Sequence, residues 1–275
     1  MKKVTTVLCI ALVMQFSVNS QEIGIQLYSV RNEIKSDLQS TLEKVRAMGI
    51  KELEGGELYG MEIHEYRKML DKIGYKMISI GVEYADLSKD LSPIIKKAKA
   101  LGATYITCFW IPHQGNEFSV TDINAAAELF NKSGKVFQEN GLKFCYHPHG
   151  YEFRPGKNGT LFDELVAKTN SNFVNFELDI FWAKQGCDDP VQLLKKYPSR
   201  FLLLHLKDRQ IGTICNDSGE ADVESNVVLG NGDVNIKEIM NAAKKSSVKH
   251  YFIEDESSRV MKQLPLSLKY LKSLK

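Results

Sequence analysis

Four side chains in the second half of the chain are able to bind a metal ion, and each follows a run of residues typical of a buried strand. They are His147, Asp179, His205 and Glu254. A single histidine or carboxylate at such a position usually has a structural role, such as a hydrogen bond or a helix cap. Four in succession, separated by 32, 26 and 49 residues, predict one site built from consecutive strand–helix units.

The mixture of imidazole and carboxylate ligands indicates a divalent cation, with Mn, Co, Zn, Mg and Fe as candidates. Such an ion can polarise a carbonyl and a neighbouring hydroxyl, which makes the adjoining carbon acidic. Glu152 and Glu254 are the candidates for the base that removes the proton. Lys207, two residues after His205, shares its side of the strand and is a candidate to stabilise an enolate oxygen. The alternative for Lys207 is an ion pair within the mouth of the fold.

Four further side chains are candidates for contacts with the substrate. Trp182 follows Asp179 closely and has the shape to stack on a sugar ring, although packing in the core is an equal alternative. Arg31 and Glu54 follow the first two strands, and His149 is the second of two histidines after another strand. The predicted partner is a small carbohydrate.

Eight strand patterns alternate with helix patterns along the chain, and they must position these side chains. Glycines end several of the helices just before the next strand, as is common in αβ loops. The predicted strands are residues 23–28, 50–54, 75–82, 104–109, 142–146, 173–178, 201–206 and 250–254.

Eight such units in about 255 residues predict a (β/α)8 TIM barrel, a fold that typically has ~250 residues. The rival is a doubly wound open sheet, which usually has a Gly-rich first turn. No GxGxxG motif follows the first strand here. In a barrel, the carboxyl ends of the strands converge, so the four candidate ligands would meet at one centre.

Two loops on the predicted catalytic face are long, residues 111–120 and 207–234. Both are interpreted as lids or specificity loops, and a disordered solvent loop is the alternative for residues 213–225. Four cysteines lie beyond the first 20 residues without a CxxC pair, and most are expected to be free. They are Cys108, Cys145, Cys187 and Cys215.

Residues 1–20 have the layout of a secretory signal peptide, with a basic start, an apolar segment and small residues before Gln21. The rest, residues 21–275, is predicted to be a single catalytic domain without a membrane span, in a periplasmic or secreted protein. Without Lys2 and Lys3 the formal net charge falls from +2 to 0, which argues against nucleic acid as a partner. The sequence leaves the oligomeric state open, with a homo-oligomer among the alternatives.

The chain resembles the sugar phosphate isomerase/epimerase family, whose fold is a xylose isomerase-like TIM barrel. The resemblance extends from about residue 23 to residue 271 and is specific for the family more than for a reaction. It depends on six segments, which are IGIQLYSVR (23–31), EGG (54–56), YHPHGYEF (146–153), ELDIFW (177–182), HLKD (205–208) and LGNGD (229–233).

This resemblance implies a divalent metal held at the ends of strands five to eight, with Asp179, His205 and Glu254 at three of the positions. The chain departs from the pattern at His147, where epimerases of this fold have a glutamate that is both ligand and base. That departure weakens a two-glutamate epimerase mechanism. Trp182 likewise stands where a substrate-binding histidine is frequent.

The paired histidines, His147 and His149, are similar to those of the inosose dehydratase branch and of keto-sugar lyase-like relatives. In those relatives an enediolate expels a β-substituent. We therefore expect a sugar isomerase or epimerase first, and a lyase or dehydratase acting on a keto-sugar or keto-glycoside second. A sugar-binding barrel without catalysis and an endonuclease-type relative acting on abasic DNA are the remaining alternatives, and the neutral charge argues against the last.

Overall fold

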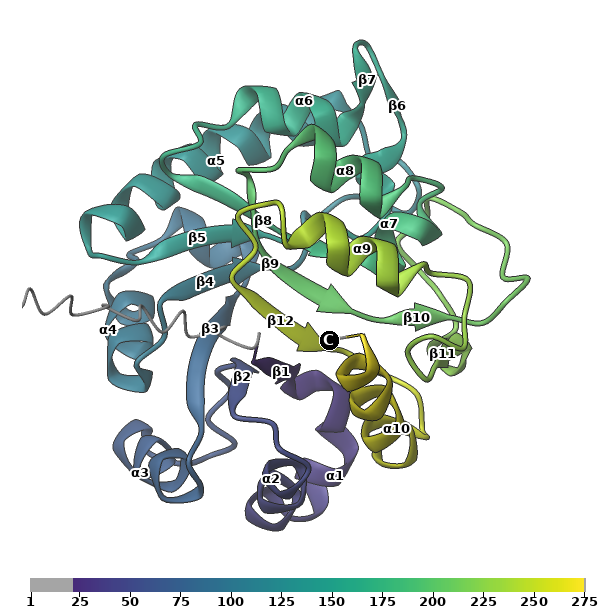
Figure 1. Cartoon of the computed structure of the whole chain (residues 1–275). Coiled ribbons are helices and arrows are strands. Elements are labelled where there is room, and N and C mark those ends of the chain that lie inside the picture. Colours follow the sequence, from purple (N-terminus) through teal and green to yellow (C-terminus); the bar gives the residue numbers. More distant parts are fainter. Residues whose placement is uncertain (1–21, 275) are drawn as a thin grey trace, which may run out of the picture.

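The computed structural model describes residues 22–274 and has a closed barrel of eight parallel strands at its centre (Figure 1). Neighbours around the barrel follow the order β1-β12-β9-β8-β5-β4-β3-β2. The predicted TIM barrel is confirmed. The strands are β1 (Ile23–Gln26), β2 (Glu52–Gly55), β3 (Lys76–Val82), β4 (Tyr105–Cys108), β5 (Lys143–Tyr146), β8 (Val174–Asp179), β9 (Phe201–Leu206) and β12 (His250–Ile253).

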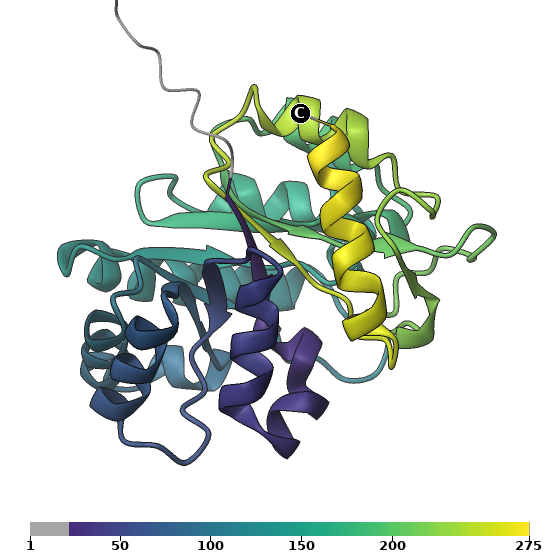
Figure 2. The ribbon, with the colours of Figure 1, turned by 60° about the horizontal axis from the view of Figure 1, so that its bottom comes forward.

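Helices surround the strands, and α10 lies along the outside beside α1 and α2 (Figures 1 and 2). Their apolar sides cover the barrel, and their polar sides face solvent. They are α1 (Arg31–Ser36), α2 (Leu38–Ala47), α3 (Ile63–Ile73), α4 (Ser92–Leu101), α5 (Val120–Glu139), α6 (Leu161–Lys168), α7 (Ile180–Gln185), α8 (Pro190–Lys196), α9 (Ile236–Ala243) and α10 (Val260–Ser273).

A glycine ends each of the helices α3 and α4, as the sequence predicts. Gly74 has a φ of 89° and Gly102 a φ of 74°, a left-handed conformation that favours glycine. The amide that follows each glycine then donates to a carbonyl in the last turn, Tyr75 to Leu70 at 2.9 Å in α3. These turns direct the chain back into β3 and β4.

One difference from the predicted strands is at the end of β1. Residues 27–30 form a 3-10 turn, η1 (Leu27–Val30), where the sequence pattern predicts two more strand residues. The side chain of Gln26 accepts a hydrogen bond from the Tyr28 amide at 3.1 Å and caps this turn. The helix that follows is also divided, because Asp37 interrupts it and caps α2 through the Ser40 amide.

The barrel interior changes from apolar to polar along its axis. An apolar cluster that includes Tyr105, Leu203 and Phe252 fills the interior near the start of the strands. Gly24 belongs to this level, because a Cβ atom there would lie 2.6 Å from the Phe252 ring. Toward the carboxyl ends the buried side chains are polar, among them Glu54, Ser79, Thr107, Glu177 and His205. A polar layer within a barrel that is otherwise a packed core marks the site.

The loop after β9 folds back on the barrel and is not an open solvent loop. A short antiparallel pair of strands, β10 (Asp208–Arg209) and β11 (Asn226–Val227), closes its base, and a turn, η4 (Val223–Ser225), precedes β11. A disulfide joins Cys187, just after α7, to Cys215 in the loop. The expectation that most cysteines are free was therefore wrong for this pair, while Cys108 and Cys145 are free and buried.

The predicted signal peptide, residues 1–20, lies outside the described residues. Within residues 22–274, no helix combines the length and the apolar character that a membrane crossing requires.

A small hairpin, β6 (Pro155–Gly156) and β7 (Gly159–Thr160), follows a turn at η3 (Tyr151–Phe153) and precedes α6.

Candidate metal centre

Four strands bring the predicted ligands to the same rim of the barrel. His147 directly follows β5, Asp179 ends β8, His205 lies in β9, and Glu254 directly follows β12. The amides of His147 and Glu254 continue the strand ladder, donating to Cys108 at 3.0 Å and to Leu206 at 3.1 Å. One potential ligand atom from each of the four lies within 4.8 Å of the others, and all four residues are buried.

Several polar atoms of this cluster have no hydrogen-bond partner among the described residues, although they are buried. They are both ring nitrogens of His147, Nδ1 of His205 and Oδ2 of Asp179. Oδ2 of Asp179 lies 3.6 Å from Nε2 of His147 and 3.8 Å from Nδ1 of His205. Unpaired buried polar atoms are costly, so their convergence fits a bound cation.

The electrostatics of the cluster also favour a cation. Burial opposes ionisation of Asp179, but the neighbouring imidazoles of His147 and His205 and the charge of Lys207 hold its pKa well below the ordinary value. Burial lowers the pKa of His205, yet Glu177, Glu254 and Glu54 raise it well above its ordinary value. Positive charge is thus stabilised where the ligand atoms meet, whether it is a proton or a metal ion.

Asp179 divides its two carboxylate oxygens between structure and site. Oδ1 accepts the amides of Phe181 at 2.7 Å and Trp182 at 3.0 Å, which caps the start of α7. Oδ2 faces the two histidines. The structural and the metal-binding interpretations of this residue are therefore compatible.

Behind His205 lie two fully buried carboxylates. Oε2 of Glu54 is 2.5 Å from Nε2 of His205 and also accepts a hydrogen bond from Gln26 at 3.1 Å. Oε1 of Glu177 lies 3.3 Å from the same Nε2 atom. With Nε2 donating to Glu54, Nδ1 is left as the nitrogen that can bind a metal. The structure thus places Glu54, a predicted substrate contact, beneath His205 within the barrel.

Glu177 is a site residue that the sequence interpretation missed. It is two residues before Asp179 on β8, so both side chains point into the barrel, and this spacing could have identified it. Burial, together with the charge of Glu54, raises the pKa of Glu177 to about 8. A neutral Glu177 would limit the repulsion between this group and the carboxyl group of Glu54.

Lys207 lies beside the cluster as an ion-pair partner of two carboxylates. Its Nζ atom is 3.2 Å from Oε2 of Glu254 and also contacts Glu256. Burial lowers the pKa of Lys207, but Glu254 and Glu256 outweigh this and raise it, so the ammonium is charged. This geometry is compatible with both roles considered for Lys207, because an ion pair at this place also leaves the charge next to the candidate ligands.

A cavity of about 820 Å³ opens above the cluster. Its size is within the ~300–1,000 Å³ of small-molecule sites. Among the predicted residues, Arg31, His149, Trp182 and Glu254 line it together with His147. Arg31 also donates to the carbonyls of Tyr28 at 2.8 Å and Glu256 at 3.1 Å. Three of the four predicted substrate contacts therefore border the same space.

Glu152 lies apart from the other predicted residues. Its carboxylate accepts hydrogen bonds from the Tyr146 hydroxyl and, at 3.0 Å, from the His149 amide, and it is not among the residues that line the cavity. Burial raises its pKa to about 7, although these hydrogen bonds oppose the shift. Of the two candidate bases, the geometry favours Glu254.

The backbone of the LGNGD segment (229–233) contacts the side chain of Asp208. The carboxylate of Asp208 accepts the amides of Gly230 at 2.8 Å, Gly232 at 3.0 Å and Val234 at 3.1 Å. This contact holds the end of the long loop to the residue that follows Lys207. The segment therefore positions the loop and does not itself reach the cluster.

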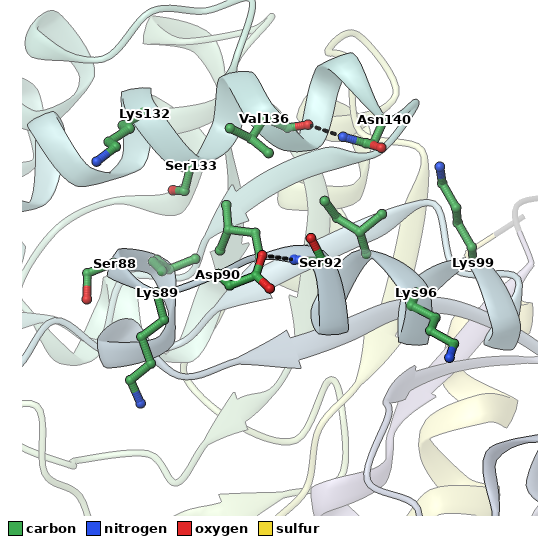
Figure 3. Close-up of a pocket in the computed structure, with 13 residues that line it drawn as sticks. Ser88, Lys89, Asp90, Ser92, Lys96, Lys99, Lys132, Ser133, Val136 and Asn140 are labelled. Atoms are coloured by element: carbon green, nitrogen blue, oxygen red, sulfur yellow. Dashed lines mark hydrogen bonds between the residues drawn. The ribbon is translucent and has the colours of Figure 1, made fainter.

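Another cavity, of about 640 Å³, lies on the outside of the barrel between α4 and α5 (Figure 3). Lys96 and Lys99 come from α4, and Lys132 and Val136 from α5 (Figure 3). None of the buried ligand clusters found among the described residues contributes to it. The mouth of the barrel is thus the site where cavity and chemistry coincide.

Comparisons with known proteins agree with this architecture. An inosose dehydratase from Geobacillus kaustophilus (strain HTA426) is 27% identical over 228 residues, which cover 71% of each protein. A solved structure of a sugar phosphate isomerase/epimerase from Parabacteroides distasonis ATCC 8503 has a TM-score of 0.73 at 25% identity, covering 94% of this chain and 98% of that one.

The IOLI protein, solved with a bound zinc atom, shares the fold, with a TM-score of 0.70 at 13% identity over 92% of this chain and 96% of that one. Residues 42–274 match the sequence profile described as "Xylose isomerase-like TIM barrel". That match includes seven of the eight barrel strands and all four candidate ligands. The chain belongs to the xylose isomerase-like TIM barrel family.

Proposed function

We propose that this protein is a metal-dependent enzyme that removes a proton from the carbon beside a carbonyl group of a carbohydrate. The observation that carries the proposal is the buried cluster of His147, Asp179, His205 and Glu254 beneath an 820 Å³ cavity. A divalent ion held there would polarise the carbonyl and the neighbouring hydroxyl of the substrate.

The side chains around the cavity supply the other requirements of the reaction. Glu254 takes the proton, because it borders the cavity and is an ionised carboxylate. The ammonium of Lys207 stabilises the negative oxygen of the resulting enediolate. Trp182, His149 and Arg31 hold the sugar, with an aromatic surface and donors at the edge of the cavity.

We favour β-elimination as the outcome of this step. The electron pair left by the proton forms a carbon–carbon double bond, while the carbon–oxygen bond at the β position breaks and the departing oxygen takes up a proton. Epimerisation through two bases requires a base on each face of the sugar. In the family pattern one of these bases is a glutamate, and this chain has His147 in its place. The likeness to an inosose dehydratase over 71% of both chains supports the same outcome.

Isomerisation or epimerisation, the reaction that the sequence favours, is the second candidate. It needs the same proton removal and the same enediolate, followed by return of the proton to a carbon of the substrate. The 25% identical sugar phosphate isomerase/epimerase from Parabacteroides distasonis supports it. A single base such as Glu254 is sufficient for transfer between adjacent carbons on one face.

The test is incubation of the protein and Mn²⁺ with a panel of keto-sugars and keto-glycosides in D₂O. Release of the β-substituent with an enone indicates elimination, and deuterium uptake without fragmentation indicates isomerisation or epimerisation. Protein that holds no divalent ion after reconstitution would contradict the proposal, as would protein that holds one and exchanges no proton on any member of the panel.

Asp179→Asn tests the assignment of the metal ligands. The amide oxygen can still cap α7, but the lost charge should reduce the affinity for Mn²⁺ or Zn²⁺ by about 100-fold or more and abolish turnover. Asp189→Asn is the matched control, because Asp189 caps α8 through the amides of Val191 and Gln192 far from the cluster. Equal metal content in both variants and wild-type protein would contradict the assignment.

A further inference from the structure

A second cavity, of about 340 Å³, adjoins the cavity above the metal cluster. The two share Trp182, Gly219 and Glu256 as lining residues. The second cavity extends under residues 219–223 of the loop after β9, and Phe181 and Lys207 form its opposite side. The two cavities are therefore neighbouring parts of one space.

We propose that the second cavity is a subsite for an uncharged, hydroxylated group joined to the reacting sugar, such as a second sugar ring. The substrate would then be a glycoside of about disaccharide size. This inference rests on the proposed function, because it takes the space above the metal cluster as the place of reaction. Under β-elimination, the group in the second cavity would leave with the oxygen that joins the two parts.

The charges around the second cavity exclude a phosphate and suit hydroxyl groups. Its one cationic lining residue, Lys207, already pairs with Glu254 and Glu256. Glu220 and Asp222 add two more carboxylates on the loop side. An anionic group would meet repulsion there, whereas sugar hydroxyls can donate hydrogen bonds to carboxylate oxygens.

Aromatic side chains provide another part of the wall. Lys207 Nζ lies 5.0 Å from the Phe181 ring and 5.5 Å from the Trp182 ring, so the ammonium is between the two rings and the carboxylates. Trp182 borders both cavities and can contact both parts of a two-ring substrate. Lys207 is correspondingly near the boundary, where the bond between the two parts would lie.

Fixed contacts hold the loop that covers this subsite. The disulfide joins Cys215 to Cys187, and Asp217 pairs with Arg154 at 3.0 Å. Gly219 has a φ of 75°, and a Cβ atom there would lie 2.6 Å from the Tyr151 ring. The loop can approach the barrel closely only with glycine at this position, so the shape of the second cavity is set before a substrate binds.

Ala221→Phe tests the subsite, because Ala221 lines only the second of the two cavities and a phenyl group would fill it. Ile214→Phe is the matched control, because Ile214 is 85% exposed on the same loop and lines neither cavity. Ala221→Leu is a smaller filling variant if the phenylalanine prevents folding, which the thermal unfolding midpoint would reveal. Turnover is compared on a keto-disaccharide and the matching keto-monosaccharide.

We expect the wild-type protein and Ile214→Phe to have a kcat/KM about tenfold or more higher for the keto-disaccharide, and Ala221→Phe to lose this preference while retaining activity on the keto-monosaccharide. Equal kcat/KM values in the wild-type protein, or an equal loss on both substrates in Ala221→Phe, would overturn the subsite and leave the proposed reaction intact.

If neither substrate reacts, the proposed function fails, and binding measurements then test whether the second cavity is a subsite. Calorimetry with cellobiose, maltose and glucose should then give about tenfold tighter binding of a disaccharide, lost in Ala221→Phe. Tighter binding of glucose 6-phosphate than of either disaccharide, or equal binding of glucose and the disaccharides, would overturn the inference.

Discussion

The two nitrogens of His205 have different neighbours, and this difference gives the site its orientation. Nε2 faces Glu54 at 2.5 Å, while Nδ1 faces Oε2 of Glu254 at 3.4 Å and the unpaired oxygen of Asp179. A carboxylate that accepts the proton of one ring nitrogen selects the tautomer and makes the other nitrogen a better ligand. Glu54 is thus suited to position His205, while the cavity proposed to bind the substrate lies on the other side of the ring.

Glu54→Gln should therefore weaken metal binding without loss of the fold. We expect the affinity for Zn²⁺ or Co²⁺ to fall by roughly 10- to 100-fold, because the amide no longer fixes the tautomer of His205. Calorimetric titration of the metal-free protein measures this directly, and the ¹⁵N shifts of the His205 ring report the tautomer.

Glu52→Gln is the control for that experiment. Glu52 belongs to the same strand and also pairs with a histidine, His250 at 2.8 Å, but at the opposite end of the barrel. Its substitution should leave metal affinity unchanged. An equal loss of affinity in the two variants would show that Glu54 acts only through the stability of β2.

The raised pKa of Glu152 predicts that the stability of the protein depends on pH. Its pKa rises from 4.5 to about 7 on folding because of burial, so its contribution to stability is fully present below pH 4.5 and is lost as the pH rises through about 7. The loss amounts to roughly 3 kcal/mol for a shift of this size. Glu152→Gln mimics the neutral form of the side chain and should not show this loss of stability.

Denaturant unfolding between pH 5 and pH 8 measures this effect. The unfolding free energy of Glu152→Gln should increase relative to wild-type protein across that range. Glu139→Gln, an exposed change on α5, should follow the wild-type curve. Parallel curves for Glu152→Gln and the wild-type protein would refute this account of Glu152.

At the scale of elements, the loop between β10 and β11 is the part of the molecule that shapes the site from above. The disulfide connects it to the second residue after α7, and the candidate ligand Asp179 caps the start of α7. The Asn216 amide donates to the Gln185 carbonyl at 2.7 Å, which adds a second attachment to α7. The loop, α7 and the cluster are therefore connected through a short path along the chain.

Cys215→Ser should release this loop while the barrel stays folded. The disulfide joins residues 28 apart, and removal of a link of this length costs roughly 3 kcal/mol in the chain-entropy account. We expect faster hydrogen exchange in residues 210–222 and a lower unfolding temperature. Exchange in the barrel strands and metal affinity should stay near the wild-type values.

Reduction of the wild-type protein is the companion measurement. Reduced protein and Cys215→Ser should share the same exchange pattern, because both lack the same bond. If the protection of residues 210–222 against hydrogen exchange is unchanged in both samples, the hydrogen bonds and the Arg154–Asp217 pair hold the loop without the disulfide.

At the scale of the whole molecule, the closed parallel barrel explains why residues distant in the chain meet. All eight strands run in one direction, so all their carboxyl ends lie on one rim. The loops on that rim carry the predicted substrate contacts, while the apolar layer below them supplies stability. This separation lets the site contain buried charges that the rest of the core excludes.

We propose that the protein is exported, because residues 1–20 have the layout of a signal peptide and the disulfide suits an oxidising compartment. Expression in a Gram-negative bacterium should yield periplasmic protein that begins near Gln21, as measured by intact mass. Leu12→Arg, which interrupts the apolar segment, should keep the full-length chain in the cytoplasm. Retention of residues 1–20 in the periplasmic protein would contradict cleavage at this place.

The sequence by itself determined the eight strands, their alternation with helices and all four candidate ligands, three of which also match positions of the family pattern. These features depend on local patterns, namely apolar runs, helix periodicity and glycine stops, which are readable without distances. The polar residue at each strand end could be assigned to the rim for the same reason, since parallel strands of a barrel end on one side.

Only the tertiary structure decided which side chains meet and which face away. Glu152 turns toward Tyr146, although its sequence position beside the paired histidines suggests the site. Glu54 lies beneath His205 because the closed barrel brings β2 and β9 together from 151 residues apart. Contacts of this kind, like the pairing of Cys187 with Cys215, depend on packing between distant segments, and no local pattern in the chain encodes them.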